Sequence, residues 1–333
     1  MTRFAPPRWT LIAMLAALTL IAAVASLLFG AVDLSVARLI SAATGSGDEV
    51  ATIILFDLRL PRTLLALVVG AMLGLAGAGL QGYLRNPLAD PSVLGTSNAA
   101  ALGAVGAIYF GIAELHPAML PVLAIGGALL SLALLFALSG RSESPLTLIL
   151  AGIAVGTLAV AGTSLALNMS PNPFAAMEIM TWLLGSLENR SFQHFWVALP
   201  CIAIGGALLL WNARALDALT LGEDAAQAMG VNLRATRLRL LIGTAIGVGG
   251  AVAVSGSIGF IGLIVPHLIR PLTDRSPSAI LLPSAIGGAA LLTLADLGVR
   301  IIPTTNELKL GVVTAFLGVP VFLIHLMREK RLW

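Results

Sequence analysis

The chain of 333 residues is 58% hydrophobic and only 11% charged, with a mean hydropathy of +0.98. Ordinary soluble domains carry about 25% charged residues, so this composition leaves little chain for a soluble domain and indicates one membrane domain over residues 1–333. The net charge of +3 comes from basic residues scattered among short loops, which argues against a nucleic-acid partner, and the single cysteine, Cys201, excludes an internal disulfide.

Ten apolar runs follow one another along the chain, at about 9–30, 63–82, 93–113, 118–138, 147–167, 192–211, 236–254, 257–271, 279–299 and 310–327. A helix needs about 20 apolar residues to cross a bilayer. The first run is longer than the apolar core of a signal peptide, about 7–15 residues, so we expect an uncleaved first helix. The eighth run is short, and only Ser255, Gly256 and Ser257 separate it from the seventh. The sequence thus predicts an all-α polytopic membrane protein with about ten transmembrane helices.

The basic residues indicate how these helices are oriented, because Lys and Arg concentrate in cytoplasmic loops. With the N-terminus inside, thirteen of the nineteen Lys and Arg residues fall in cytoplasmic segments and six in outer ones. An even number of spans agrees with this arrangement. We therefore expect both the N-terminus and the C-terminus to lie in the cytoplasm.

The stretch 59–98 joins a charged entrance, an apolar Gly-rich span and a structured turn. Arg59 and Arg62 stand at the outer end of the span, where Pro61 suits the first turn of a helix. Two cations oppose the helix dipole there, at a cost of about 0.3–1 kcal/mol each when exposed. Two interpretations remain open, namely contact with lipid headgroup phosphates and contact with carboxylates on a partner protein.

The inner end of the same span leads into residues 86–91, NPLADP, which predict a compact turn. Asp90 followed by Pro91 is a favourable N-cap and first-turn pair for the next helix. From the residues alone, a plain connection between two helices is the favoured interpretation of this turn.

The longest outer segment, residues 168–191, holds an apolar stretch at 174–185 that is too short to span the membrane. We expect a re-entrant or surface-lying helix there. Its large apolar side chains either line a path for cargo or are ordinary packing residues: Phe174, Met177, Met180 and Trp182.

The longest inner segment, residues 212–239, contains the pattern of a short capped helix. Thr220 and Glu223 have the spacing of a capping box, and Gly230 suits the C-cap. The pattern predicts two to three turns over LGEDAAQAMG, residues 221–230, with a surface of small residues. Acidic residues and small alanine faces make poor lipid anchors, so a protein partner is favoured over a helix that lies on lipid.

Four stretches together resemble one family, the FecCD-type permeases of ABC importers for iron–siderophores, haem and vitamin B12. They are RLPR at 59–62 with GAGLQGYLRNPLADPSVLG at 77–95, LGEDAAQAMG at 221–230, GSIGFIGLIVPHLIR at 256–270, and ADLGVRIIPTTNELKLGVVTAFLGVPVFLIHLM at 295–327. The resemblance runs from Arg59 to the C-terminus. It implies the fold of a type II ABC importer permease, in the inner membrane of a bacterium, with ten helices per subunit.

The resemblance also implies partners and a mechanism. The permease would form a homodimer with the pathway at its axis, bind two cytoplasmic ATPase subunits, and receive a metal chelate from a periplasmic substrate-binding protein. ATP binding and hydrolysis in the partner would drive alternating access, moving an iron–siderophore, or alternatively haem or cobalamin, from periplasm to cytoplasm.

Residue roles follow from the same resemblance. Arg59, Arg62 and Arg300 would meet acidic residues of the binding protein. Asn86 and Leu88 would form a cytoplasmic gate with Pro145 and Leu146 opposite, although Pro145 and Leu146 replace the small hydroxyl residues expected there. The coupling helix seated in the ATPase would comprise Leu221, Gly222, Glu223, Asp224, Ala225, Ala226, Met229 and Gly230.

Two other function classes are weighed against this one. A secondary transporter usually places ionisable groups within its spans, whereas these runs hold few, apart from Asp296 and His267; Asp296 and Arg300 could pair four residues apart. For an intramembrane enzyme, the four histidines are far apart and form no metal-ligand motif. The chain also lacks the phosphate-binding loop of ATPases. We therefore expect a transport subunit rather than an enzyme, without cofactor or bound metal, whose cargo is a chelated metal.

Overall fold

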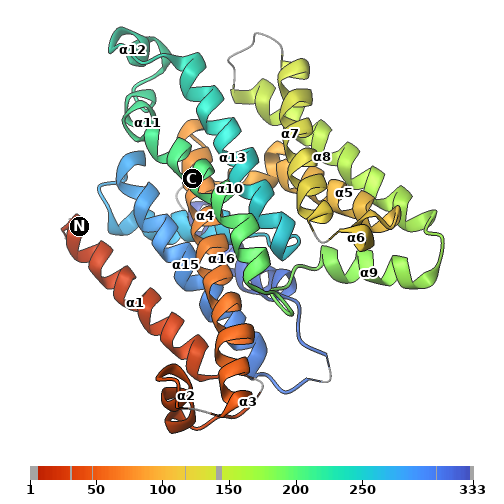
Figure 1. Cartoon of the computed structure of the whole chain (residues 1–333). Coiled ribbons are helices and arrows are strands. Elements are labelled where there is room, and N and C mark those ends of the chain that lie inside the picture. The colour runs from red at the N-terminus through yellow and green to blue at the C-terminus, as the bar shows by residue number, and fades with distance from the viewer. Residues whose placement is uncertain are drawn as a thin grey trace.

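The computed structural model describes residues 7–30, 32–46, 48–116, 118–139, 145–304 and 306–330. Within them, every predicted apolar run forms a helix (Figure 1). These ten helices are α1 (Arg8–Leu28), α4 (Leu60–Tyr83), α5 (Thr96–Tyr109), α7 (Met119–Ser139), α8 (Pro145–Asn168), α10 (Phe192–Trp211), α13 (Leu233–Ser255), α14 (Ile261–Ile269), α15 (Pro277–Ile301) and α16 (Leu310–Lys330). Seven are long and apolar enough to span a bilayer, and α5, α14 and the described apolar part of α16 are shorter. The all-α prediction with about ten helices is confirmed.

Short helices connect the long ones and occupy the two ends of the bundle (Figure 1). One end carries α2 (Val36–Ala43) and α3 (Glu49–Thr52), followed by a π-helical turn, Ile53–Arg59, that leads into α4. The other end carries α11 (Ala213–Leu219) and α12 (Glu223–Ala228). We refer to these as the α2–α3 end and the α12 end. The connection after α5 contains α6 (Ile112–Leu115).

The centre of the bundle is built from α4, α13 and α15, which are the most buried of the long helices. The pair α4–α15 makes the most extensive helix–helix contact, and glycines allow the two backbones to approach each other closely. A methyl group at Gly70 would overlap the carbonyl oxygen of Gly288, and one at Gly74 would overlap that of Ser284. The Gly-rich run within α4 is therefore explained by close packing on α15.

The seventh and eighth predicted runs are two separate helices. Gly256 ends α13 with a φ of 68°, in the left-handed region that glycine adopts without strain. The next helix, α14, has nine residues and rises about 14 Å, roughly half of the hydrocarbon thickness. Helix α14 packs on α4 and α15, so this half-length element lies inside the bundle rather than crossing the membrane by itself.

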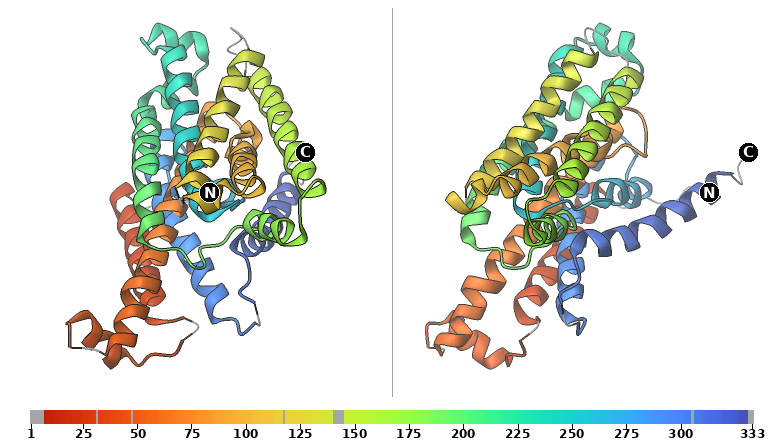
Figure 2. Two further views of the ribbon diagram at one scale, coloured as in Figure 1. Left: turned by 45° about the vertical axis from the view of Figure 1, so that its right-hand side comes forward. Right: turned by 90° about the vertical axis from the view of Figure 1, so that its right-hand side faces the viewer.

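The segment 168–191 forms the predicted short helix, α9 (Pro173–Leu183), with Asn172 as its N-cap. It runs across the direction of the long helices in Figures 1 and 2 and packs against α5. In the second view of Figure 2, α16 extends away from the rest of the bundle. Its first turn is anchored where Gly311 N–H donates to Leu184 O at 3.1 Å.

Candidate functional site

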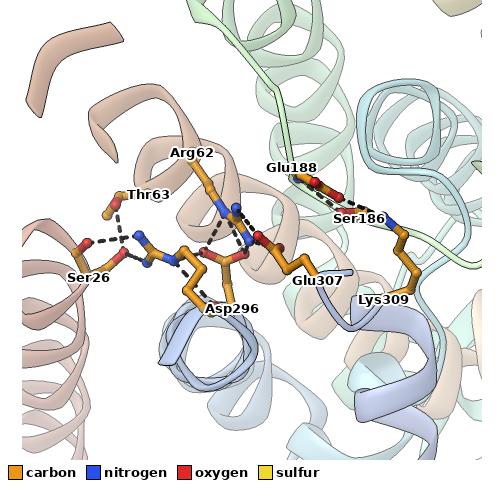
Figure 3. Close-up of polar contacts among 9 residues, drawn as sticks. Ser26, Arg62, Thr63, Ser186, Glu188, Asp296, Glu307 and Lys309 are labelled. Atoms are coloured by element: carbon orange, nitrogen blue, oxygen red, sulfur yellow. Dashed lines mark hydrogen bonds and ion pairs between the residues drawn. The ribbon is translucent and has the colours of Figure 1, made fainter. Parts of the chain in front are cut away.

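At the α2–α3 end, Arg62 lies between two carboxylates of its own chain (Figure 3). Its Nε donates to Asp296 Oδ1 at 2.9 Å, and its Nη1 donates to Glu307 Oε2 at 2.9 Å. Arg62 begins α4, Asp296 lies in α15, and Glu307 lies in the connection before α16. The predicted pairing of Asp296 with Arg300 is also present, with 3.2 Å between Asp296 Oδ2 and Arg300 Nε.

Helix α1 supplies the remaining partners of this cluster. Arg300 Nη1 donates to Ser26 O at 3.1 Å, and its Nη2 donates to the Ser26 hydroxyl. The Ser26 hydroxyl also bonds to Thr63 Oγ1 at 2.7 Å. Because two arginines face two carboxylates, the cluster carries no net charge, and it joins α1, α4 and α15 at one level.

Arg59 is held in a different way. Its guanidinium donates to the carbonyl oxygens of Leu27 and Leu28 at 2.8 and 2.7 Å, and to Val32 O at 2.6 Å. The last carbonyls of a helix lack partners within the helix, so Arg59 completes the C-terminal end of α1. The sequence gives no sign of this role.

The three arginines named from the sequence therefore converge, but they are buried. Arg59, Arg62 and Arg300 are 5%, 8% and 7% exposed, and Asp296 is fully buried. The sequence suggested that Arg59 and Arg62 are cations at a helix entrance, whereas all three arginines are engaged by groups of the same chain. Glu307 was missed because it lies in a loop with no recognisable pattern.

A cavity of about 220 Å³ opens beside this cluster. It is lined by all three of these arginines together with Glu188, Glu307 and a fourth arginine, Arg190. The Nε of Arg190 is buried without a hydrogen-bond partner among the described residues. Glu188 is held by Lys309 Nζ at 2.6 Å, as Figure 3 shows. Arg190 was not selected from the sequence, where it is one cation in a polar loop.

Toward the α12 end, residues 86–91 form the predicted compact turn. Leu88 N–H donates to Asn86 Oδ1 at 2.9 Å, and Leu88 is 40% exposed. Asp90 accepts from Ser92 N–H and caps a 3₁₀ turn, Pro91–Leu94, so that α5 begins only at Thr96. Asp90 is thus an N-cap as predicted, but of this 3₁₀ turn, and Gly95 is the N-cap of α5.

Helix α8, which begins at Pro145 and Leu146, lies beside the 3₁₀ turn that follows Asn86 and Leu88 in the chain. Helix α8 packs against the 3₁₀ turn, where Gly152 approaches the backbone of Val93 and Leu94. Leu146, in the first turn of α8, is 64% exposed. The side chain of Pro145 lies outside the described part of the structure.

The predicted capping box at the α12 end is wrong. The Thr220 hydroxyl donates backwards to Asp217 O at 2.6 Å, and Gly222, not Thr220, is the N-cap of α12. The helix is also shorter than predicted, with six residues. Gly230 follows its C-terminal end with a φ of 85°, as expected of a C-cap glycine.

The exposed surface of this short helix also differs from the predicted small-residue face. Ala226 is fully buried within the main hydrophobic core. Ala225 is half-buried, whereas Leu221 and Met229, on either side of α12, are 68% and 63% exposed. Leu221 and Met229, not Ala225 and Ala226, are therefore the large side chains that a partner would meet.

The four proposed cargo-path residues all lie in α9 but differ in their exposure. Phe174, Met177 and Met180 are 85%, 64% and 50% exposed and recur at helical spacing on one face. Trp182 is half-buried and packs against three hydrophobic clusters. Packing explains Trp182, and the other three form an apolar face without a partner in the described structure.

Known proteins resemble this chain over most of its length. The model of the FecCD transport family matches residues 18–328. The uncharacterized ABC transporter permease protein YvrB of Bacillus subtilis is 40% identical over 292 residues, covering 86% of this chain and 82% of that protein. The vitamin B12 import system permease protein BtuC of Salmonella typhi is 39% identical over 280 residues, covering 83% and 84%.

Solved structures agree with the sequence comparisons. A structure described as an inward-facing ABC transporter of the metal-chelate type has a TM-score of 0.87 and 33% identity, covering 96% of this chain and 99% of that one. PsaBC from Streptococcus pneumoniae, at 18% identity and a TM-score of 0.53, shares the fold alone. The chain therefore belongs to the FecCD transport family, as a multi-pass membrane permease of the ABC importer type.

Proposed function

We propose that this permease moves an iron–siderophore from periplasm to cytoplasm by alternating access, driven by two partner ATPase subunits. The observation that carries the proposal is the α12 end, where Leu221 and Met229 expose apolar side chains beyond the ends of the long helices. Exposed apolar side chains that flank a helix outside the membrane core are typical of a protein contact. The ATPase is the partner that such a segment serves in an ABC importer.

The pathway would lie between two copies of this chain. Helix α8 exposes one face that includes Thr157 and Ser164 as well as Leu150 and Leu158. Lipid-facing helix surfaces are apolar, whereas hydroxyl and small side chains suit a water-lined path or a helix–helix contact. This mixed face supports α8 as a lining element, with Asn86, Leu88, Pro145 and Leu146 closing the path on the cytoplasmic side.

The binding protein would dock at the α2–α3 end. Arg59, Arg62, Arg190 and Arg300 line one cavity, through which an incoming carboxylate would approach them. Because Glu307 already occupies two donors of Arg62, the incoming carboxylate would compete with it for that arginine. This docking would agree with the expected orientation, in which both termini lie in the cytoplasm.

The identity of the cargo is the most specific statement in the proposal. The apolar face of α9, with Phe174, Met177 and Met180, would grip a chelate by shape and apolar contact. The similarity to BtuC favours cobalamin as the second candidate, and haem is the third. Binding of ferric siderophores, haem and cobalamin to the cognate periplasmic protein, measured in parallel, would separate these three cargoes.

The coupling role of the α12 end is tested by two substitutions, Leu221→Ala and Met229→Ala, in the purified permease reconstituted with its ATPase. We expect association to weaken about tenfold or more for the pair, since truncating buried interface anchors costs more than about 1 kcal/mol each. Phe29→Ala is the matched control. Phe29 is 57% exposed and directly follows the last residue of α1, away from the α12 end. Equal association of all variants would refute the coupling assignment.

A further inference from the structure

A second cavity, of about 290 Å³, lies at the α12 end and has no role in the function proposed above. It is enclosed by the C-terminal end of α4, Thr220, the 3₁₀ turn Arg270–Leu272 and the start of α15. Three arginines line it: Arg85, Arg270 and Arg275. Among the described residues that line it, none is a carboxylate.

The positive charge in this cavity is poorly compensated. Arg85 is 3.8 Å from Glu223, a separation too long for a hydrogen bond. No carboxylate lies within 4.0 Å of the guanidinium groups of Arg270 and Arg275 among the described residues, and these two cations repel each other. The Nε of Arg270 is buried without a hydrogen-bond partner in the described structure.

The neighbouring carboxylates are already engaged elsewhere. Asp217 Oδ1 accepts from Ser278 N–H at 2.8 Å. Asp274 accepts from the backbone N–H and the hydroxyl of Ser276, and these two bonds lower the pKa of Asp274 below its ordinary value. Asp274 is thus ionised at neutral pH but directed toward its own turn.

Arg270 is also held in position by a buried side chain of α4, Gln81. Gln81 is buried in α4, accepts from Arg270 Nη2 at 3.0 Å, and donates to Gly262 O at 3.2 Å. A buried glutamine that is itself anchored to the backbone of α14 holds the guanidinium at the cavity. Such a preorganised cation binds an anion without the entropic cost of ordering a long side chain.

From this geometry we propose that the cavity binds a phosphate group, from either a phospholipid headgroup or free phosphate. Guanidinium groups match phosphate oxygens with paired hydrogen bonds. The cavity lies where apolar helices end, which is the level of lipid headgroups. Leu268 and Leu272, two residues to either side of Arg270, are 50% and 41% exposed and offer a surface for an acyl chain.

The test uses the full-length permease in vesicles of equal parts phosphatidylglycerol and phosphatidylcholine, followed by native mass spectrometry of the retained lipid. Arg275→Gln, alone and with Arg270→Gln, should lower phosphatidylglycerol retention about fivefold per arginine and leave phosphatidylcholine unchanged. Arg234→Gln is the matched control, since Arg234 is exposed at the same end and does not line the cavity. Arg275 is itself exposed, so its single variant should fold normally.

A second arm adds inorganic phosphate to the delipidated protein and follows thermal unfolding. A rise in the midpoint for the unmodified protein but not for Arg275→Gln supports the site with free phosphate as its ligand. Equal lipid retention by all variants, together with no effect of phosphate, would overturn the proposal. The proposal would also be overturned if the arginine variants bound lipid and phosphate normally but no longer associated with the ATPase. The arginines would then serve a protein contact.

Discussion

At the scale of single residues, Asp296 is the carboxylate at the centre of the buried ion cluster. It is fully buried and bonds both Arg62 and Arg300. Removing one member of a buried ion cluster leaves an uncompensated charge, at a cost of about 3–5 kcal/mol. We expect Asp296→Asn to lower the free energy of unfolding in detergent micelles by about 3 kcal/mol.

Glu307→Gln is the control for that change. The Glu307 side chain is 18% exposed, and Arg62 would keep its bonds to Asp296. The loss should therefore be much smaller than for Asp296→Asn. Equal losses for the two variants would show that Asp296 does not hold the cluster together.

The same Glu307 provides a test of docking. If carboxylates of the binding protein compete with Glu307 for Arg62, then Glu307→Gln should tighten binding-protein association about fivefold at low salt, where the attraction between the two proteins is screened least. Glu49→Gln removes an exposed acid in α3, near the same end, and controls for the general change in charge. Weaker association of Glu307→Gln in a surface-binding assay would exclude Arg62 as a docking residue.

At the scale of helices, the contact between α4 and α15 depends on glycine. A methyl group at Gly70 meets the backbone of Gly288, which cannot move aside as a flexible side chain would. Overpacking of this kind costs about 1–3 kcal/mol, so Gly70→Ala should lower stability in thermal unfolding by that amount. Gly106→Ala in α5 meets nothing within 4 Å and should be neutral or stabilising. A neutral Gly70→Ala would refute the close approach.

The long helices were predictable because a bilayer imposes length and apolarity on every span. The short elements were not. Thr220 and Glu223 matched the capping-box pattern, yet tertiary contacts place the Thr220 hydroxyl on Asp217 O instead. The alanines of α12 resembled a partner surface, but Ala226 packs into the core of its own chain. Pattern alone cannot tell a small residue that is buried internally from one that is buried by a partner.

This correction changes which substitutions test the α12 end. A bulky residue at Ala226 would disturb the permease itself, since that position is fully buried. Substitutions at Leu221 and Met229 act on exposed side chains and leave the core intact. Only substitutions at Leu221 and Met229 can therefore change the association with the ATPase without also changing the folding of the permease.

At the scale of the whole molecule, the sequence predicted the class of protein but not the network that joins its helices. Arg62 and Asp296 are 234 positions apart, and no local signal connects them. The three arginines were selected by resemblance, whereas their burial and the added roles of Arg190 and Glu307 emerged only from the tertiary structure. Charges whose partners are distant in sequence look exposed until the fold is known.

The ion cluster also bears on the secondary-transporter alternative. Arg62 and Arg300 are matched by Asp296 and Glu307, and all four lie at the α2–α3 end. An ion-coupled transporter needs an ionisable site near the middle of the bilayer that can release and rebind its ion. A compensated cluster at one end of the bundle fits a structural or docking role better.

Uptake into proteoliposomes tests the central claim most directly. The permease would be reconstituted with its cognate ATPase, with the binding protein and a radiolabelled ferric siderophore outside and ATP inside. We predict accumulation that requires both ATP and the binding protein and is insensitive to ionophores. Accumulation that continues without ATP and follows a proton or sodium gradient would contradict the account.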